Sequence, residues 1–199
     1  MKNKGLLIVI SAPSGAGKST LCDTIIARNR NFRRSISCTT RPPRPGEKNG
    51  RDYYFLSKQK FQSLIRSGGL VEWAVVHGNY YGTPKAPLKK NIALGRDVIL
   101  NIDVQGGFSV KKHFNNSVLI FVMAPSFKDL EKRLKGRGQD SEEVIRRRLL
   151  NAKNEIACLK KYEYLVINDK LNRAALEIEA IILAEHRRVR NISNTSFKK

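Results

Sequence analysis

The chain has 199 residues, enough for one large domain whose core needs no disulfide or metal to stabilise it. Lysine and arginine outnumber aspartate and glutamate by 38 to 17, and the formal net charge of +21 predicts an anionic partner such as a nucleotide or a nucleic acid. The three cysteines show no metal-ligand or disulfide pattern, and no apolar run approaches the ~20 residues that span a membrane. We therefore expect a cytoplasmic protein that associates with no membrane.

The apolar segments predict a parallel α/β fold. Four runs rich in leucine, isoleucine and valine occur at residues 6–10, 98–102, 118–122 and 164–167. Helical patterns separate them at residues 18–28, 88–94, 126–135 and 171–190, and another helix is expected to begin after Asp140 as its N-cap. Continuous apolar strands that alternate with helices are typical of a parallel sheet with helices on both faces.

The residues after the first apolar run predict a phosphate-binding loop. A strand that ends in a glycine-rich turn before a helix directs backbone N–H groups at an anion; a lysine reaches the terminal phosphates, and a following hydroxyl can bind Mg²⁺. The candidate ATP-binding residues are Ala12, Pro13, Ser14, Gly15, Ala16, Gly17, Lys18, Ser19 and Thr20, with Ser19 as the metal ligand. Ala12 replaces the first glycine of the usual pattern. The alternative is a flexible connection that binds nothing.

Between residues 33 and 87 the pattern changes to short strands and turns rich in proline and glycine, which predicts an inserted subdomain. Prolines hold Arg41 and Arg44 in an extended segment, and planar guanidinium groups suit a phosphate. The hydroxyl groups of Tyr53 and Tyr81 are further donors for the same anion. A proline-rich peptide ligand and an RNA-binding arm are the alternatives for this segment alone.

The chain resembles the guanylate kinases over nearly its whole length. The motifs that carry the resemblance lie at residues 39–55, 78–83, 102–106, 133–138 and 168–169, in the order found in that family. The resemblance implies a P-loop NTPase core made of residues 1–33, 87–125 and 150–199. It also implies a GMP-binding insert at residues 34–86 and a small lid at residues 126–149.

The resemblance implies that the γ-phosphate of MgATP is transferred to GMP, with dGMP as a further expected acceptor. The implied GMP-binding residues are Ser37, Arg41, Arg44, Tyr53, Glu72, Tyr81, Thr83 and Asp103. The implied catalytic residues are Lys18, Arg41, Arg137 and Arg148, and ATP would also contact Arg133, Arg137 and Asn168. The carboxylate of Glu72 suits guanine because it can accept hydrogen bonds from both N1–H and the 2-amino group, whereas adenine presents an acceptor there.

Two other classes of function stay open at this point. A catalytically inactive interaction module could keep the guanylate-kinase shape, although the intact phosphate loop argues against it. A basic nucleic-acid binder has only the net charge in its favour, and we expect no specific nucleic acid partner. Asn101 stands where many guanylate kinases carry an aspartate, so the resemblance does not determine which residues surround the metal ion and its ligands. The chain is expected to be a monomer or a homodimer.

Overall fold

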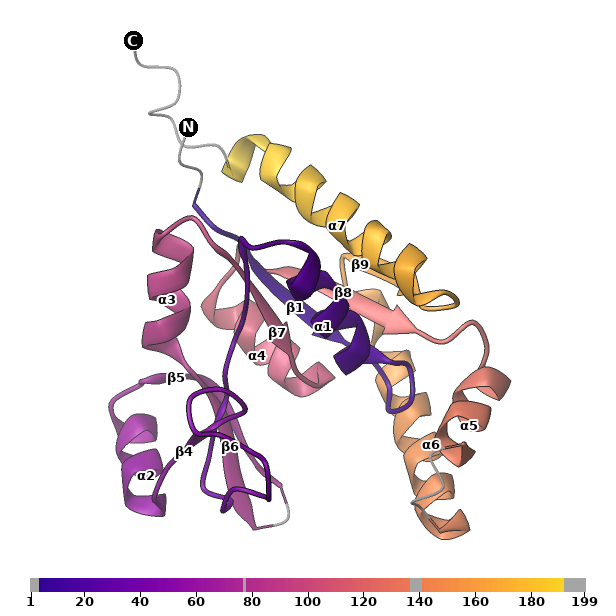
Figure 1. Ribbon diagram of the computed structural model, residues 1–199, viewed down its shortest axis with the longest axis horizontal. Helices are drawn as coiled ribbons and strands as arrows, with labels where there is room; N and C mark the ends of the chain where they lie inside the picture. Colours follow the sequence, from indigo (N-terminus) through magenta and orange to yellow (C-terminus); the bar gives the residue numbers. More distant parts are fainter. Residues whose placement is uncertain (1–3, 77, 137–140, 192–199) are drawn as a thin grey trace.

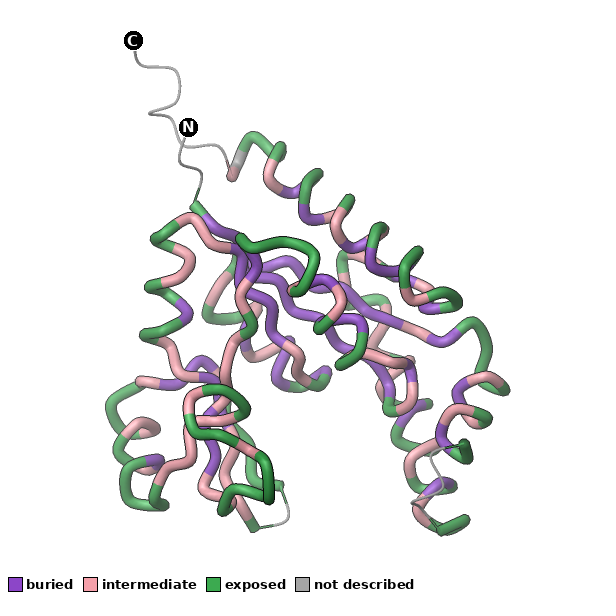
Figure 2. Tube along the Cα trace, viewed as in Figure 1, coloured by how far each residue is buried: buried purple, intermediate pink, exposed green. Residues whose placement is uncertain are grey.

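The computed structural model describes residues 4–76, 78–136 and 141–191. Its core is a parallel sheet of five strands in the order β2-β7-β1-β8-β9. The strands are β1 (Leu7–Ser11), β2 (Phe32–Arg34), β7 (Asp97–Asn101), β8 (Val118–Met123) and β9 (Tyr164–Ile167). All five residues of the central strand β1 are buried (Figure 2), which explains its continuous apolar sequence.

Helices cover both faces of this sheet (Figure 1). On one face, α1 (Lys18–Arg28) and α7 (Leu171–Arg187) pack against a core that includes Ile8 and Ile10. On the other face, α3 (Lys85–Ala93) and α4 (Val104–His113) pack against Leu7 and Val9. Because alternate residues of a strand point to opposite faces, β1 contributes to both cores.

A second sheet has four strands in the order β4-β3-β6-β5. Its strands are β3 (Cys38–Thr39), β4 (Tyr54–Phe55), β5 (Leu70–Val76) and β6 (Asn79–Pro84). Helix α2 (Lys58–Arg66) packs its buried Phe61 against Cys38 and Leu70 of this sheet. In Figure 1 this sheet extends from the lower left of the core, whereas α5 (Phe127–Lys135) and α6 (Glu142–Ala157) extend from the lower right.

The predicted fold class is confirmed, with corrections to several elements. Strand β2, at the edge of the core sheet, and helix α4, after β7, were not predicted. Helix α3 begins at Lys85 rather than at residue 88, and α7 ends at Arg187 rather than at residue 190. Ser141 is the N-cap of α6, since its side chain accepts a hydrogen bond from the Val144 N–H, while Asp140 lies outside the described residues. No helix within the described ranges is long and apolar enough to cross a membrane.

Candidate active site

The loop between β1 and α1 lies at the carboxyl end of the central strand, where ligands of parallel α/β sheets bind. Gly15 and Gly17 adopt φ angles of 92° and 85°, a region that favours glycine. The side-chain amide of Asn168 donates a hydrogen bond of 2.8 Å to the Ala16 carbonyl. A Cβ atom on Gly17 would lie 2.6 Å from Asn168 Nδ2, so the close approach of these two segments requires glycine there. Asn168, which follows β9, therefore helps to hold the phosphate loop in this conformation.

Lys18 and Ser19 begin α1 and are held by residues at the end of β7. The Lys18 ammonium donates a hydrogen bond of 2.7 Å to the Ile102 carbonyl. Burial lowers the pKa of Lys18, and this effect outweighs the charges of Cys22, Asp103 and Glu155, which raise the pKa. The exposed Ser19 hydroxyl accepts a hydrogen bond of 3.1 Å from the Asn101 amide. A cavity of about 310 Å³ is lined by Glu155 and by residues Ala12, Pro13, Ser14, Gly15, Gly17, Lys18, Ser19 and Thr20.

Arg41 lies in the segment between β3 and β4 of the second sheet, and it contacts both an acidic and an aromatic side chain. Its guanidinium donates to Glu47 Oε1 at 2.8 Å, and this bond is the main reason that the pKa of Arg41 is raised. The guanidinium carbon lies 5.5 Å from the centre of the Tyr53 ring, which itself packs edge-on to Tyr81 with ring centres 6.0 Å apart. Glu47 also accepts a hydrogen bond from the backbone N–H of the exposed Arg44. Three predicted phosphate-binding side chains, Arg41, Tyr53 and Tyr81, thus lie together.

Glu72 and Thr83 form a second cluster on the neighbouring strands β5 and β6. The fully buried Thr83 hydroxyl donates to Glu72 Oε1 at 2.5 Å. Burial raises the pKa of the Glu72 carboxyl, the Thr83 hydrogen bond lowers it, and the charge of Asp103 raises it further. Asp103 is also the N-cap of α4, where its Oδ1 accepts from the Gly106 N–H at 2.7 Å. The half-buried Ser37 precedes β3 and accepts the Tyr54 N–H through its carbonyl at 2.9 Å.

The sequence model of the guanylate kinase family matches residues 4–185. The chain belongs to the guanylate kinase family. A guanylate kinase of Caldanaerobacter subterraneus subsp. tengcongensis is 48% identical over 95% of this chain and 92% of its own length, and one of Syntrophotalea carbinolica is 49% identical over 93% and 88%. The crystal structure of guanylate kinase from Anaplasma phagocytophilum superimposes with a TM-score of 0.78 at 32% identity, covering 98% of this chain and 94% of that one.

Family membership gives the chain the enzymatic activity of a guanylate kinase, phosphorylation of GMP by ATP. Guanylate kinases generally use ATP together with Mg²⁺. The two clusters described above lie on different sheets. Lys18 and the phosphate loop belong to the core sheet, whereas Arg41, Glu72 and their neighbours belong to the second sheet.

Two residues expected in the lid of this guanylate kinase, Arg133 and Arg148, lie on α5 and α6. Arg133 donates to the Asn168 carbonyl at 2.8 Å, beside the phosphate loop. Arg148 is half-buried between the buried Ile145 and Ala152, whereas its neighbours Arg146 and Arg147 are exposed. Arg148 is therefore the least exposed arginine of this run. Arg137, the remaining predicted lid residue, lies outside the described residues.

Two carboxylates near these clusters, Glu47 and Glu155, were not among the predicted site residues. Glu47 holds both Arg41 and the backbone of Arg44, and its place in the proline-rich turn after Arg41 was the available signal. Glu155 lines the phosphate-loop cavity, and its signal was its position seven residues after Arg148, on the same face of α6. Ala12, the departure from the usual loop, is 5% exposed and packs within the core.

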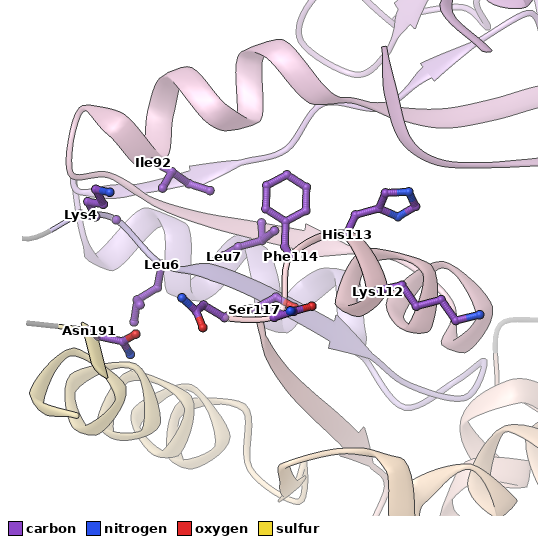
Figure 3. Close-up of a pocket in the computed structure, with 12 residues that line it drawn as sticks. Lys4, Leu6, Leu7, Ile92, Lys112, His113, Phe114, Ser117 and Asn191 are labelled. Atoms are coloured by element: carbon purple, nitrogen blue, oxygen red, sulfur yellow. The ribbon is translucent and has the colours of Figure 1, made fainter. Parts of the chain in front are cut away.

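A further cavity in the described part of this guanylate kinase is separate from these clusters. It measures about 540 Å³ and lies at the amino end of β1, whereas the phosphate loop follows the carboxyl end of that strand. Figure 3 shows Ile92 of α3 and Phe114, the residue after α4, above Leu6 and Leu7. None of the predicted nucleotide-binding residues lines this cavity.

Proposed function

We propose that Arg41, Arg44, Tyr53 and Tyr81 bind the phosphate of GMP in this chain. The proposal is supported by the arrangement of Arg41 over the Tyr53 ring and beside Tyr81, which points one cation and two hydroxyl-bearing rings to the same region. The Glu47 carboxylate holds Arg41 in this place through the 2.8 Å ion pair. A guanidinium that is already ordered loses little freedom when it binds a phosphate bidentately.

The base of GMP is recognised by Ser37, Glu72, Thr83 and Asp103. Glu72 Oε1 already accepts the Thr83 hydroxyl, which fixes the carboxylate in one orientation. The ionised carboxylate accepts from guanine N1–H and from the 2-amino group. Adenine would place an acceptor against it, and the unpaired buried charge costs on the order of 2 kcal/mol or more. We assign none of these residues to the 2′-position of the sugar, so we expect dGMP to be a substrate as well.

ATP binds with its phosphates in the loop of residues 12–20, and Arg133 and Asn168 flank it. The donor set suits Mg²⁺ that arrives with the nucleotide. Ser19 offers an exposed hydroxyl, its neighbour Asn101 is uncharged, and the described residues contain no group of three or more His, Cys, Asp or Glu side chains that could hold a metal ion alone. Bound there, Mg²⁺ would neutralise charge on the phosphates of ATP.

A phosphate oxygen of GMP attacks the γ-phosphorus of ATP in line, and the bond from that phosphorus to the bridging oxygen of ADP breaks. Lys18, Arg41, Arg137 and Arg148 stabilise the charge on the transferring phosphoryl group. No nucleophilic side chain is required, because positioning and charge stabilisation supply most of the catalysis in phosphoryl transfer. Lys18 now donates to the Ile102 carbonyl, so it exchanges this partner for phosphate oxygens when ATP binds.

The observation that carries this assignment is the half-buried Lys18 at the phosphate loop, and Lys18→Met tests it. Methionine keeps an unbranched stem as long as the four carbons of lysine and lacks only the ammonium group. We therefore expect the variant to fold with a thermal midpoint equal to or above that of the wild type, because burial disfavours the charge of Lys18. Removal of the cation lowers kcat for ADP formation from ATP and GMP by about 10³-fold. A variant that keeps its activity would contradict the role of Lys18, and an inactive wild type would favour the interaction module.

A further inference from the structure

The carboxyl end of β7 holds the first two residues of α1 through two different kinds of contact. Lys18 donates to the Ile102 carbonyl at 2.7 Å, whereas Ser19 accepts a hydrogen bond of 3.1 Å from the side-chain amide of Asn101. Asn101 is the last residue of β7 and pairs with Ile10 of the central strand, so the core sheet fixes its backbone. Its amide therefore contacts the start of α1 from a rigid position.

The contact between Asn101 and Ser19 has a defined polarity. A serine hydroxyl can donate one hydrogen bond and accept two, whereas an amide nitrogen can only donate. The Asn101 nitrogen therefore occupies one lone pair of Ser19 Oγ and cannot accept the hydroxyl hydrogen. Within residues 4–76, 78–136 and 141–191 the structure records no acceptor for that hydrogen. The Ser19 hydroxyl thus keeps one donor and one lone pair for a ligand.

The surroundings of Ser19 determine which ligand can use these two groups. Ser19 is exposed and lines the cavity of about 310 Å³ together with Lys18 and the rest of the phosphate loop. Backbone N–H groups and a cation favour a phosphate oxygen in such a cavity, and this oxygen can accept the Ser19 hydrogen. The remaining lone pair suits Mg²⁺, which prefers oxygen ligands. Neither contact requires the hydrogen bond from Asn101 to break, unlike the contact of Lys18 with Ile102.

We propose that Asn101 is a positioning residue whose amide directs the Ser19 hydroxyl hydrogen toward the phosphates of ATP and leaves Mg²⁺ a single lone pair of that oxygen. This inference rests on the proposed binding of ATP in the phosphate loop. The nucleotide then gains a hydrogen bond from Ser19 that needs no metal. A carboxylate at position 101 would reverse the contact, because Ser19 would donate to it and keep both lone pairs for the metal. Asn101 therefore makes nucleotide affinity less dependent on Mg²⁺.

The test measures the Kd of ADP by calorimetry with EDTA and again with saturating Mg²⁺, and takes the ratio of the first value to the second. Asn101→Asp reverses the polarity of the hydrogen bond at constant size, but it also adds a charge. Ser19→Ala removes the hydroxyl, so Asn101→Asp combined with Ser19→Ala measures the effect of the charge alone. Asn116→Asp, at an exposed position in the turn before β8, controls for net charge.

For Asn101→Asp we expect the Kd of ADP without Mg²⁺ to rise about tenfold, because the phosphates lose the Ser19 hydrogen and are repelled by the new charge. With Mg²⁺ the Kd should stay within about twofold of the wild-type value, since attraction between the carboxylate and the metal offsets this repulsion. The ratio of the two values therefore rises. When Ser19→Ala is also present, Asn101→Asp should raise the ratio only about threefold. Asn116→Asp should leave it unchanged.

Asn101→Ala removes the donor without adding a charge. The Ser19 hydroxyl can then rotate, and we expect the Kd of ADP without Mg²⁺ to rise about threefold while the Kd with Mg²⁺ stays unchanged. A merely structural contact would instead raise both Kd values equally and lower the thermal midpoint of the nucleotide-free protein. That result would overturn the inference.

Two further results would also overturn it. An equal effect of Asn101→Asp on the ratio with and without the Ser19 hydroxyl would mean that only the added charge matters. An unchanged ratio in Asn101→Asp would mean that the direction of the hydrogen bond between these side chains does not control nucleotide binding. Failure of the wild type to bind ADP under either condition would instead refute the proposed ATP site, which distinguishes the two hypotheses.

Discussion

Glu72 illustrates how one side chain can serve binding at the expense of stability. Its side chain is half-buried, and burial raises its pKa more than the Thr83 hydrogen bond lowers it. An acid whose pKa is raised in the folded state destabilises the protein while it is ionised, and this cost disappears as the pH falls through the raised pKa. The proposed base-binding site therefore contains a carboxylate that the fold alone would prefer neutral.

Substitution Glu72→Gln is expected to raise the KM of GMP by about 10²-fold, because an amide cannot accept from both guanine donors and places its own N–H₂ group against one of them. The thermal midpoint at pH 7.5 is expected to rise slightly, since the buried charge is removed while Thr83 keeps an acceptor. Steady-state kinetics and a thermal melt measure the two effects. A variant with an unchanged KM for GMP would remove Glu72 from the base site.

The same carboxylate predicts a pH dependence. As the pH falls through the raised pKa of Glu72, protonation removes one acceptor, and the KM of GMP rises. This rise should begin at a higher pH than the range near 4.3 in which an ordinary glutamate titrates. Initial rates at varied GMP between pH 5 and pH 8 give the profile, and the profile of Glu72→Gln should lack this rise. Identical profiles for the two proteins would assign the titration to another group.

The turn before β4 is ordered by Glu47 rather than by regular secondary structure. Its carboxylate binds the Arg41 guanidinium at 2.8 Å and the Arg44 N–H at 2.7 Å. Glu47→Ala removes both bonds, and the KM of GMP is expected to rise about threefold to tenfold because Arg41 must then be ordered by the ligand. Steady-state kinetics at varied GMP measure the change, which should leave the KM of ATP as it is.

Asp52→Ala is the control for this prediction. Asp52 lies in the same exposed segment and binds the Lys48 N–H and Arg51, but it makes no contact with Arg41 that the structure records. Its removal should change the KM of GMP by less than twofold, in keeping with the small effect of exposed ion pairs. A lower KM in Glu47→Ala would mean that Glu47 competes with the phosphate instead of presenting Arg41 to it.

Most elements could be predicted from hydrophobic pattern, and the two omissions have physical reasons. Strand β2 has three residues, two of them arginines, at the edge of the sheet, so it shows no apolar run. Helix α4 contains Gly106 and Gly107, which disfavour a helix in isolation. A Cβ atom on Gly107 would lie 3.2–3.3 Å from Tyr162, Ser11 and Val9. Close packing, invisible in local sequence, therefore selects glycine inside this helix.

In the candidate site, the residues that could be predicted are those that lie in local sequence motifs. Arg41 and Tyr53 lie in the segment between β3 and β4, and Tyr81 lies on the neighbouring strand β6. The structure brings these three side chains together. The position of Glu155 depends on how α6 packs against the phosphate loop, which is a contact between residues far apart in the chain. Pairings of this kind arise from tertiary packing and have no local signature.

The ends of the described chain are joined by a buried carboxylate. Asp97 at the start of β7 is 2% exposed, accepts the Leu6 N–H at 2.8 Å and lies 2.9 Å from His186 Nε2 of α7. It therefore connects the first strand, a neighbouring strand and the last helix. These contacts lie at the amino ends of the parallel strands, whereas the phosphate loop follows the carboxyl end of β1, so they should affect folding rather than catalysis.

Asp97→Ala is expected to lower the free energy of unfolding by about 2–4 kcal/mol, because the buried Leu6 N–H loses its acceptor. Chemical denaturation measures this change. The exposed partner of Arg34, Asp23, provides the control, and Asp23→Ala should cost less than about 1 kcal/mol. The KM values of folded Asp97→Ala should match those of the wild type. An equal, small loss for both variants would contradict the importance of the buried contact.

The whole molecule combines a phosphate loop on one sheet with a proposed base-binding carboxylate on another. This combination predicts that the enzyme phosphorylates GMP selectively. The most direct measurement is ADP formation in a coupled assay with MgATP and each of GMP, AMP, UMP and CMP. We expect kcat/KM for GMP to exceed the value for each of the other three nucleotides by at least about 10²-fold. Preference for AMP, or no turnover with any of the four, would contradict the account.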